Sequence, residues 1–188
     1  GNPNNLELRR NIQNVIAFFK KQGVKIVFYS KEDPTNYDRF IDIAQECDYI
    51  FTTAKEKVSD YINDCNNENV YVLEFGVNPM YNNPIGLRKN TRFDGAIFAG
   101  SWYEKYPRRM GDTRTIFDGV IASEKELKII DRNYEKNLKN HLFPLEYLQY
   151  ISPSIDHNTL QKVFKLFPWA INLNSVQKSE TMFANRVY

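Results

Sequence analysis

Residues Phe93 to Ile130 read FDGAIFAGSWYEKYPRRMGDTRTIFDGVIASEKELKII, and this stretch decides the fold. Its two ends, FDGAIFA and ELKII, are short apolar runs of the kind that form buried strands. Between them Asp112 can cap a helix, whose apolar residues recur at helical spacing: Ile116, Phe117, Val120 and Ile121. A strand, a helix and a second strand in this order predict a right-handed βαβ unit with parallel strands.

The first half of the chain shows the same alternation. Leu6 to Gln22 carries apolar residues at helical spacing and is followed by Gly23, a residue common just after a helix. Three apolar and aromatic runs with helical patterns between them then predict strands at Val24–Tyr29, Asp48–Thr53 and Val70–Phe75. We therefore expect a parallel sheet here as well.

The last third of the sequence predicts two further helices and a strand. Within Leu145 to Phe167 lies an apolar stripe that Pro168 ends, and Trp169–Leu173 reads as a strand. Ser179 can cap a final helix that carries Met182, Phe183 and Val187. The predicted fold class is α/β, with two partial Rossmann-like units, each built on a parallel sheet.

The stretch GVNPMYNNPIGLRKN, residues 76–90, has breakers and no apolar period, so it reads as a linker. It predicts two domains, 1–87 with the hinge and 88–188. Each would hold about three strands, fewer than the about 5 or 6 of an average sheet. Because the sequence also ends at Tyr188 inside a helical pattern, we expect it to be a fragment of a longer protein.

Composition narrows the classes of partner. The formal charge of +2 gives no reason to expect nucleic-acid binding, and no apolar run approaches the about 20 residues that span a bilayer. Peripheral association with a membrane is compatible with the sequence, although no segment encodes it. Cys47 and Cys65 lack the spacing of a disulfide framework or a zinc site, so we expect packing thiols in a reducing cytosol.

Ligands of open parallel sheets bind in the loops that follow the strands. After the first strand come Lys31, Glu32 and Asp33, which could position a substrate hydroxyl at a cleft or form a solvated charged turn. A second loop, residues 76–79, suits a hinge, and its glycine has a sufficient structural role there.

The loop after FDGAIFA is richer in chemistry. Gly100 permits close approach of a ligand, the amides of the following helix favour anions, and Arg108 or Arg109 could clamp a diphosphate without a metal. Arginines at a helix start are also common on plain surfaces. In the fourth loop, residues 172–179, Asn and Ser side chains could bind a ribose, a base or a sugar, while Ser179 also serves as a cap.

Other reactive residues form no known catalytic pattern. Asp131 and Arg132 follow a strand and could pair with each other, which favours a structural ion pair over catalysis. His141 and His157 lie in polar stretches without a nucleophile motif, so a Ser/His/Asp site is not supported. No DxD, HExxH or paired metal-ligand spacing is present in the sequence.

Four stretches taken together resemble a known family. They are KEDPTNYDRFIDIAQECDYIFTTAKEKVSDY, VYVLEFGVNPMYNNPI, FAGSWYEKYPRR and INLNSVQKSETMFANRVY, at residues 31–61, 70–85, 98–109 and 171–188. In this order they resemble the CgeB-like glycosyltransferases, a group with the GT-B fold that often belongs to surface-polysaccharide or teichoic-acid loci. The resemblance runs from about Val24 to the end. It departs at Asn82, where many relatives have histidine.

The resemblance implies two Rossmann-like domains, an acceptor-side domain that residues 1–87 would end and a donor-binding domain that residues 88–188 would begin. It implies a nucleotide-diphosphate sugar as donor, a glycan or lipid-linked acceptor, and no cofactor or metal. The donor-binding residues would be Gly100, Ser101, Tyr103, Arg108, Arg109, Asn174, Ser175, Ser179, Thr181, Met182 and Arg186. A carboxylate and a glycine turn that help to hold the donor in relatives would lie beyond Tyr188.

The sequence thus predicts part of a cytoplasmic glycosyltransferase that is inactive as this piece alone, with catalytic residues unassigned. Two alternatives stay open: a non-catalytic Rossmann-like binding module, and a transferase of glycerol phosphate from a CDP donor.

Overall fold

The computed structural model describes residues 5–80, 82–136 and 138–182. These residues form two compact units, and each is α/β with an all-parallel sheet, as the sequence predicts. Unit 1 comprises residues up to Gly76 together with the segment 176–182, and unit 2 comprises residues 77–175. The roles predicted for residues 1–87 and 88–188, acceptor side and donor side, are functional assignments that the fold alone does not test.

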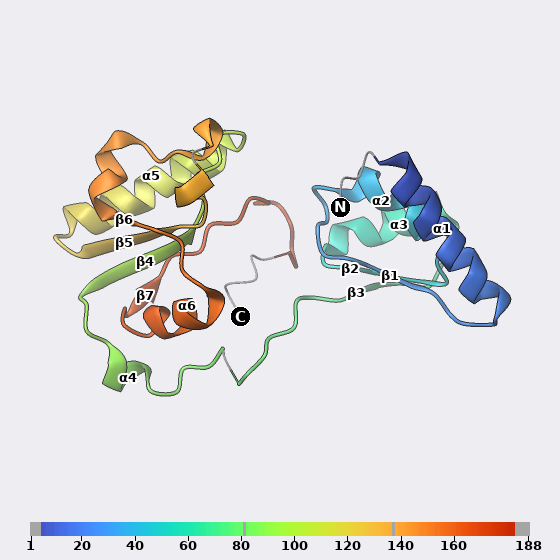
Figure 1. The fold of residues 1–188 in the computed structure, drawn as a ribbon, viewed down its shortest axis with the longest axis horizontal. Coiled ribbons are helices and arrows are strands. Elements are labelled where there is room, and N and C mark those ends of the chain that lie inside the picture. The colour runs from blue at the N-terminus through green and yellow to red at the C-terminus, as the bar shows by residue number, and fades with distance from the viewer. Residues whose placement is uncertain (1–4, 81, 137, 183–188) are drawn as a thin grey trace. The chain divides into compact units, whose positions relative to one another are not determined.

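Unit 1 alternates helices and strands along the chain. Its elements are α1 (Leu6–Lys21), β1 (Val27–Ser30), α2 (Tyr37–Ala44), β2 (Tyr49–Thr52), the 3-10 turn η1 (Lys55–Lys57), α3 (Val58–Cys65) and β3 (Val70–Val72). The strands pair in the order β1-β2-β3, all parallel (Figure 1). Sequence order and sheet order therefore agree, as expected when each helix forms one crossover.

The core of unit 1 lies on one face of its sheet. Ile50 of β2 and Val70 of β3 pack with Tyr37 and Ala44 of α2 and with Tyr61 of α3. The opposite face presents Phe51 and Tyr71, whose rings lie 5.7 Å apart between centroids. Alternation of side chains along each strand produces this division.

Unit 2 has a four-stranded parallel sheet in the order β6-β5-β4-β7 within the described residues. Its main elements are α4 (Leu87–Asn90), β4 (Gly95–Gly100), α5 (Pro107–Ala122), β5 (Glu126–Asp131), β6 (Ile151–Ser152), α6 (His157–Phe164) and β7 (Trp169–Ala170). Three 3-10 turns, η2 (Tyr134–Lys136), η3 (Lys139–His141) and η4 (Leu145–Tyr150), join β5 to β6.

Helices cover both faces of this second sheet (Figure 1). On one face Phe98 and Ile129 pack with Phe117 of α5 and with Tyr147 of η4. On the other, Ile97 and Ile130 pack against α6. Coverage of both faces explains why β4 and β5 are continuous apolar runs rather than alternating ones.

Several predicted boundaries are wrong, each for a local reason. The helix predicted to start at Asp112 begins at Pro107, because proline suits a first helical position where its missing N–H is not needed. The first strand starts at Val27, since the Asp48 side chain binds the Ile26 N–H at 2.8 Å. The third strand ends at Val72 and the last at Ala170, shorter than predicted, and β6 is not predicted at all.

The helix predicted after Ser179 falls mainly on residues 183–188, which lie outside the described residues. The Ser179 hydroxyl accepts a hydrogen bond from the Met182 N–H at 3.0 Å, and residues 179–182 themselves are not helical, so the predicted cap stays a prediction. Among the helices of the described ranges, none combines the length and apolar character needed to cross a membrane.

Candidate functional site

The carboxyl ends of β4 and β5 bring two loops of unit 2 together. Gly100 and Asp131 are register partners at the ends of these neighbouring parallel strands. The Arg132 N–H continues the pairing by donating to the Gly100 carbonyl at 3.0 Å. The loop after Gly100 therefore starts beside the loop after Asp131, at the edge where open sheets bind ligands.

Ser101 is the buried centre of this edge and is 3% exposed. Its carbonyl accepts a hydrogen bond from Arg109 Nη1 at 3.2 Å, and its hydroxyl accepts one from Asn133 Nδ2 at 2.9 Å. One residue thus ties the start of α5 to the end of β5. Asn133 has no counterpart among the sequence predictions, and only its place two residues after a strand could have drawn attention to it.

The two arginines predicted as a diphosphate clamp differ in their surroundings. Arg109 is 3% exposed, and its guanidinium carbon lies 5.3 Å from the centre of the Tyr103 ring. Arg108, the neighbouring residue in the first turn of α5, is exposed. Arg109 therefore holds the loop from inside, while the Arg108 side chain is exposed to solvent.

Tyr103 also contacts Arg132 and His141. Its hydroxyl receives a hydrogen bond from Arg132 Nη2 at 3.3 Å, and its ring packs edge to face with the His141 ring, with 4.9 Å between the ring centres. Arg132 thus contacts Tyr103 rather than forming the expected ion pair with Asp131. His141 matches no motif in the sequence, yet its ring packs on Tyr103 at this edge, a contact that no local sequence pattern predicts.

Asp131 is 6% exposed, and its Oδ1 accepts a hydrogen bond from the Asn133 N–H at 2.8 Å. Burial raises the pKa of the Asp131 carboxyl above its ordinary value, while the Asn133 N–H and His141 act in the opposite direction. Burial therefore disfavours the charged form of this carboxyl group.

We expect Asp131→Asn to remove a contribution to the stability of unit 2 that falls as pH rises from acid to neutral. Because the folded pKa of Asp131 lies above its unfolded value, its burial penalty is absent below about pH 4, grows as pH rises from there, and is complete above the folded pKa. The advantage of the variant over wild type should therefore increase from acid to neutral pH. Both tryptophans, Trp102 and Trp169, belong to unit 2, so urea unfolding followed by tryptophan fluorescence measures it. A difference that is constant or falls with pH contradicts the assignment.

The fourth predicted loop is divided between the two units. Asn174 and Ser175 belong to unit 2, where the Asn172 amide donates to Asn174 Oδ1 at 3.1 Å. Ser179, Thr181 and Met182 belong to unit 1. Arg186 lies outside the described residues. The structure thus places three of these predicted donor residues with the first sheet instead of the second.

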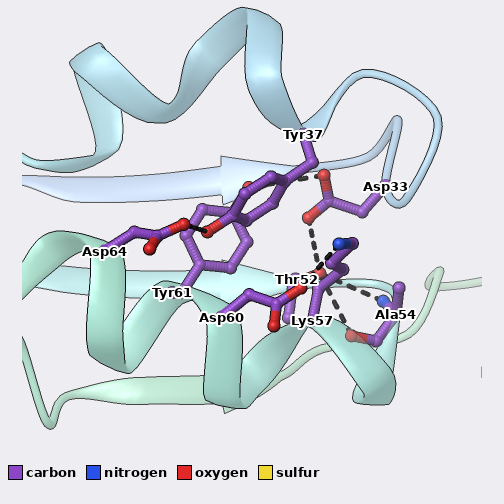
Figure 2. A network of polar contacts seen from close by, with 8 residues as sticks. All are labelled: Asp33, Tyr37, Thr52, Ala54, Lys57, Asp60, Tyr61 and Asp64. Atoms are coloured by element: carbon purple, nitrogen blue, oxygen red, sulfur yellow. Dashed lines mark hydrogen bonds and ion pairs between the residues drawn. The ribbon is translucent and has the colours of Figure 1, made fainter.

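The first predicted loop, in unit 1, separates into two exposed residues and a buried one. Lys31 and Glu32 are exposed, whereas Asp33 has 0% exposure. Asp33 Oδ2 accepts from the Thr52 hydroxyl at 2.6 Å and Oδ1 accepts from the Tyr61 hydroxyl at 3.3 Å (Figure 2). Asp33 therefore joins the end of β1 to β2 and α3.

Beside Asp33, Lys57 contacts Asp60 and the ring of Tyr37 (Figure 2). Its Nζ lies 2.6 Å from Asp60 Oδ2 and 4.5 Å from the centre of the Tyr37 ring. The hydrogen bond to Asp60 raises the pKa of Lys57, and burial raises the pKa of Tyr37, whose hydroxyl donates to Asp64 at 2.7 Å. Lys57 and Tyr37 are thus both held by contacts within unit 1, which is a structural role.

The cysteines, Asn82 and the possible metal ligands form no reactive or metal-binding group within the described residues. Cys47 and Cys65 are free thiols, and burial raises the pKa of each to about 11, which disfavours the reactive thiolate. The backbone N–H of Asn82 donates to the Asn78 carbonyl at 2.9 Å in the linker. Across residues 5–80, 82–136 and 138–182, no three His, Cys, Asp or Glu side chains gather as a metal site would require.

No protein-family model matches the chain, and no curated protein matches it either. The conclusion that stands is architectural. The chain is an α/β protein with two all-parallel sheets of Rossmann-like build.

Proposed function

We propose that unit 2 binds a nucleotide-diphosphate sugar at the edge after β4 and β5, and that the chain is part of a glycosyltransferase acting on a surface glycan or its lipid-linked precursor. The observation that carries the proposal is the Ser101 junction, which fixes the β4–α5 loop from both sides. A fixed loop beside the start of a 16-residue helix is a setting in which backbone amides favour an anion.

The charges at this edge suit a diphosphate. Arg108 and Arg132 are both exposed cations at the carboxyl end of the sheet, one at the start of α5 and one after β5. In transfer of a sugar, the bond from its anomeric carbon to the diphosphate breaks while a bond to an acceptor hydroxyl oxygen forms. Positive side chains and helix amides stabilise the departing diphosphate, as the proposal requires.

We expect Arg108→Ala to weaken nucleotide binding about tenfold, the effect of losing one charge-assisted hydrogen bond. Titration calorimetry with UDP, GDP, CDP and their sugar conjugates measures it. Arg10→Ala is the matched control, because Arg10 is an exposed cation on α1 of unit 1. Arg109→Ala should weaken binding because the loop at Ser101 is no longer held, and it should also lower the unfolding midpoint of unit 2.

Two outcomes count against the proposal. Unchanged nucleotide affinity in Arg108→Ala removes the diphosphate assignment. Absence of binding or stabilisation by every nucleotide tested favours the second candidate, a non-catalytic binding module. The inward position of Arg109, which uses its guanidinium to hold Ser101, is the observation that favours that alternative. Selective binding of CDP and CDP-glycerol would instead indicate transfer of glycerol phosphate.

A further inference from the structure

The Thr181 hydroxyl joins two backbone groups of unit 1 that lie far from it in the sequence. It donates to the Thr53 carbonyl at 2.8 Å and accepts from the Lys55 N–H at 2.8 Å. The adjacent Glu180 forms an ion pair with Lys55 Nζ at 2.9 Å. Residues 176–182, called the strap below, are thereby fastened to the corner between β2 and α3.

The backbone of this corner needs a hydrogen-bonding side chain from another part of the chain. Ala54 stands at the N-cap position of η1, which runs directly into α3, and its methyl group cannot accept a hydrogen bond. Thr53 and Ala54 both have 0% exposure, so their backbone polar groups need partners within the protein. Thr53 and Ala54 are therefore buried, and the residue at the N-cap position has no side chain that could accept a hydrogen bond from the backbone.

Local groups satisfy part of this need. The Thr53 N–H donates to the Ser30 carbonyl at 3.2 Å, and the Ala54 N–H donates to the Thr52 hydroxyl at 3.1 Å. The Ala54 carbonyl accepts from the Lys57 N–H at 2.9 Å (Figure 2 shows Ala54 beside Thr52 and Lys57). The Thr53 carbonyl and the Lys55 N–H are the two groups that Thr181 serves.

A single hydroxyl does this because it is both donor and acceptor. In a parallel sheet, a neighbouring strand bonds the carbonyl and the N–H that flank one residue. Thr181 makes the same pair of bonds around Ala54 with its side chain alone. Only serine could replace it with the same atoms, since valine has the shape without the hydrogen bonds.

We propose that the strap is a conformational latch, in which Thr181 caps the β2–α3 corner of unit 1 from the far end of the chain. The latch is independent of the nucleotide proposal.

Hydrogen exchange read by mass spectrometry tests the latch on the 188-residue chain. Thr181→Val should speed amide exchange at residues 55–58 about tenfold, the effect expected when the Lys55 N–H loses its hydrogen-bond acceptor. Thr181→Ser should keep the wild-type rate. Glu180→Gln should change it by less than about threefold, because Glu180 and Lys55 are an exposed pair.

The remaining outcomes each decide the question. Wild-type exchange at residues 55–58 in Thr181→Val overturns the proposal, and so does equal acceleration across β1, which would mean general loss of unit 1 instead of a local release. Tryptophan fluorescence reports on unit 2 and should be the same in all variants. Loss of the folded signal there would also overturn the latch.

Discussion

Gly95→Ala should destabilise unit 2 by about 3 kcal/mol, the upper end of the usual range for overpacking. A Cβ at Gly95 would lie 1.9 Å from the Glu126 carbonyl oxygen and 2.6 Å from its carbonyl carbon. These are backbone atoms of the paired strand β5, so no side chain can move aside to make room. The strands would have to separate at their first register pair, Gly95 with Glu126.

Urea unfolding followed by tryptophan fluorescence measures this effect, because both tryptophans are in unit 2. Gly119→Ala is the matched control in the same unit. For a Cβ built at Gly119, no atom of the described chain outside its own helical surroundings lies within 4 Å, and alanine should stabilise the helix by up to about 1 kcal/mol. Equal unfolding midpoints for the two variants would show that the β4–β5 contact is looser than described.

Asp33→Ala should have the second largest effect and lower the stability of unit 1 by about 3 kcal/mol. The carboxylate is fully buried and receives hydroxyl donors from Thr52 and Tyr61. Removing it takes the carboxylate acceptor from both hydroxyls, leaves the Thr52 hydroxyl with its longer contact of 3.5 Å to the Ala54 carbonyl, and disconnects the end of β1 from α3.

Hydrogen exchange across β1 and β2 measures this loss, with the tryptophan signal of unit 2 as an internal reference. Glu32→Ala is the control, since Glu32 is exposed beside Asp33 and should change stability by no more than about 0.5 kcal/mol. If the two variants behave alike, Asp33 is not the structural junction that its contacts indicate. A stable Asp33→Asn protein that loses ligand binding would restore Asp33 as a cleft residue.

The fold was predictable where a local pattern is strong. The run GAIFAG, the stripe around Phe117 and the run ELKIID each form the element expected, because burial on both faces of a sheet selects continuous apolar residues. Element ends were less predictable. Asp112 has the chemistry of a cap, but Pro107 starts the helix a turn and more earlier, and only the packed structure decides between the two.

The candidate site was predictable only as a set of loops. Following the strands located Ser101 and Arg109 correctly at the carboxyl edge of a sheet. Whether Arg109 faces solvent depends on Ser101 and Tyr103, and the partner of the Ser101 hydroxyl is Asn133, 32 residues away. Thr181 bonds residues 126 and 128 positions earlier, so no spacing rule could have paired them.

The return of residues 176–182 to unit 1 gives the units an interrupted order along the sequence. Among the described residues, unit 2 occupies the stretch 77–175 between two parts of unit 1. A chain shortened after Ser175 would therefore remove a described part of the first unit. Excision of residues 77–175, with Gly76 joined to Val176, is the cut that follows the physical boundary of unit 1, whereas a single cut anywhere in the linker separates neither unit cleanly.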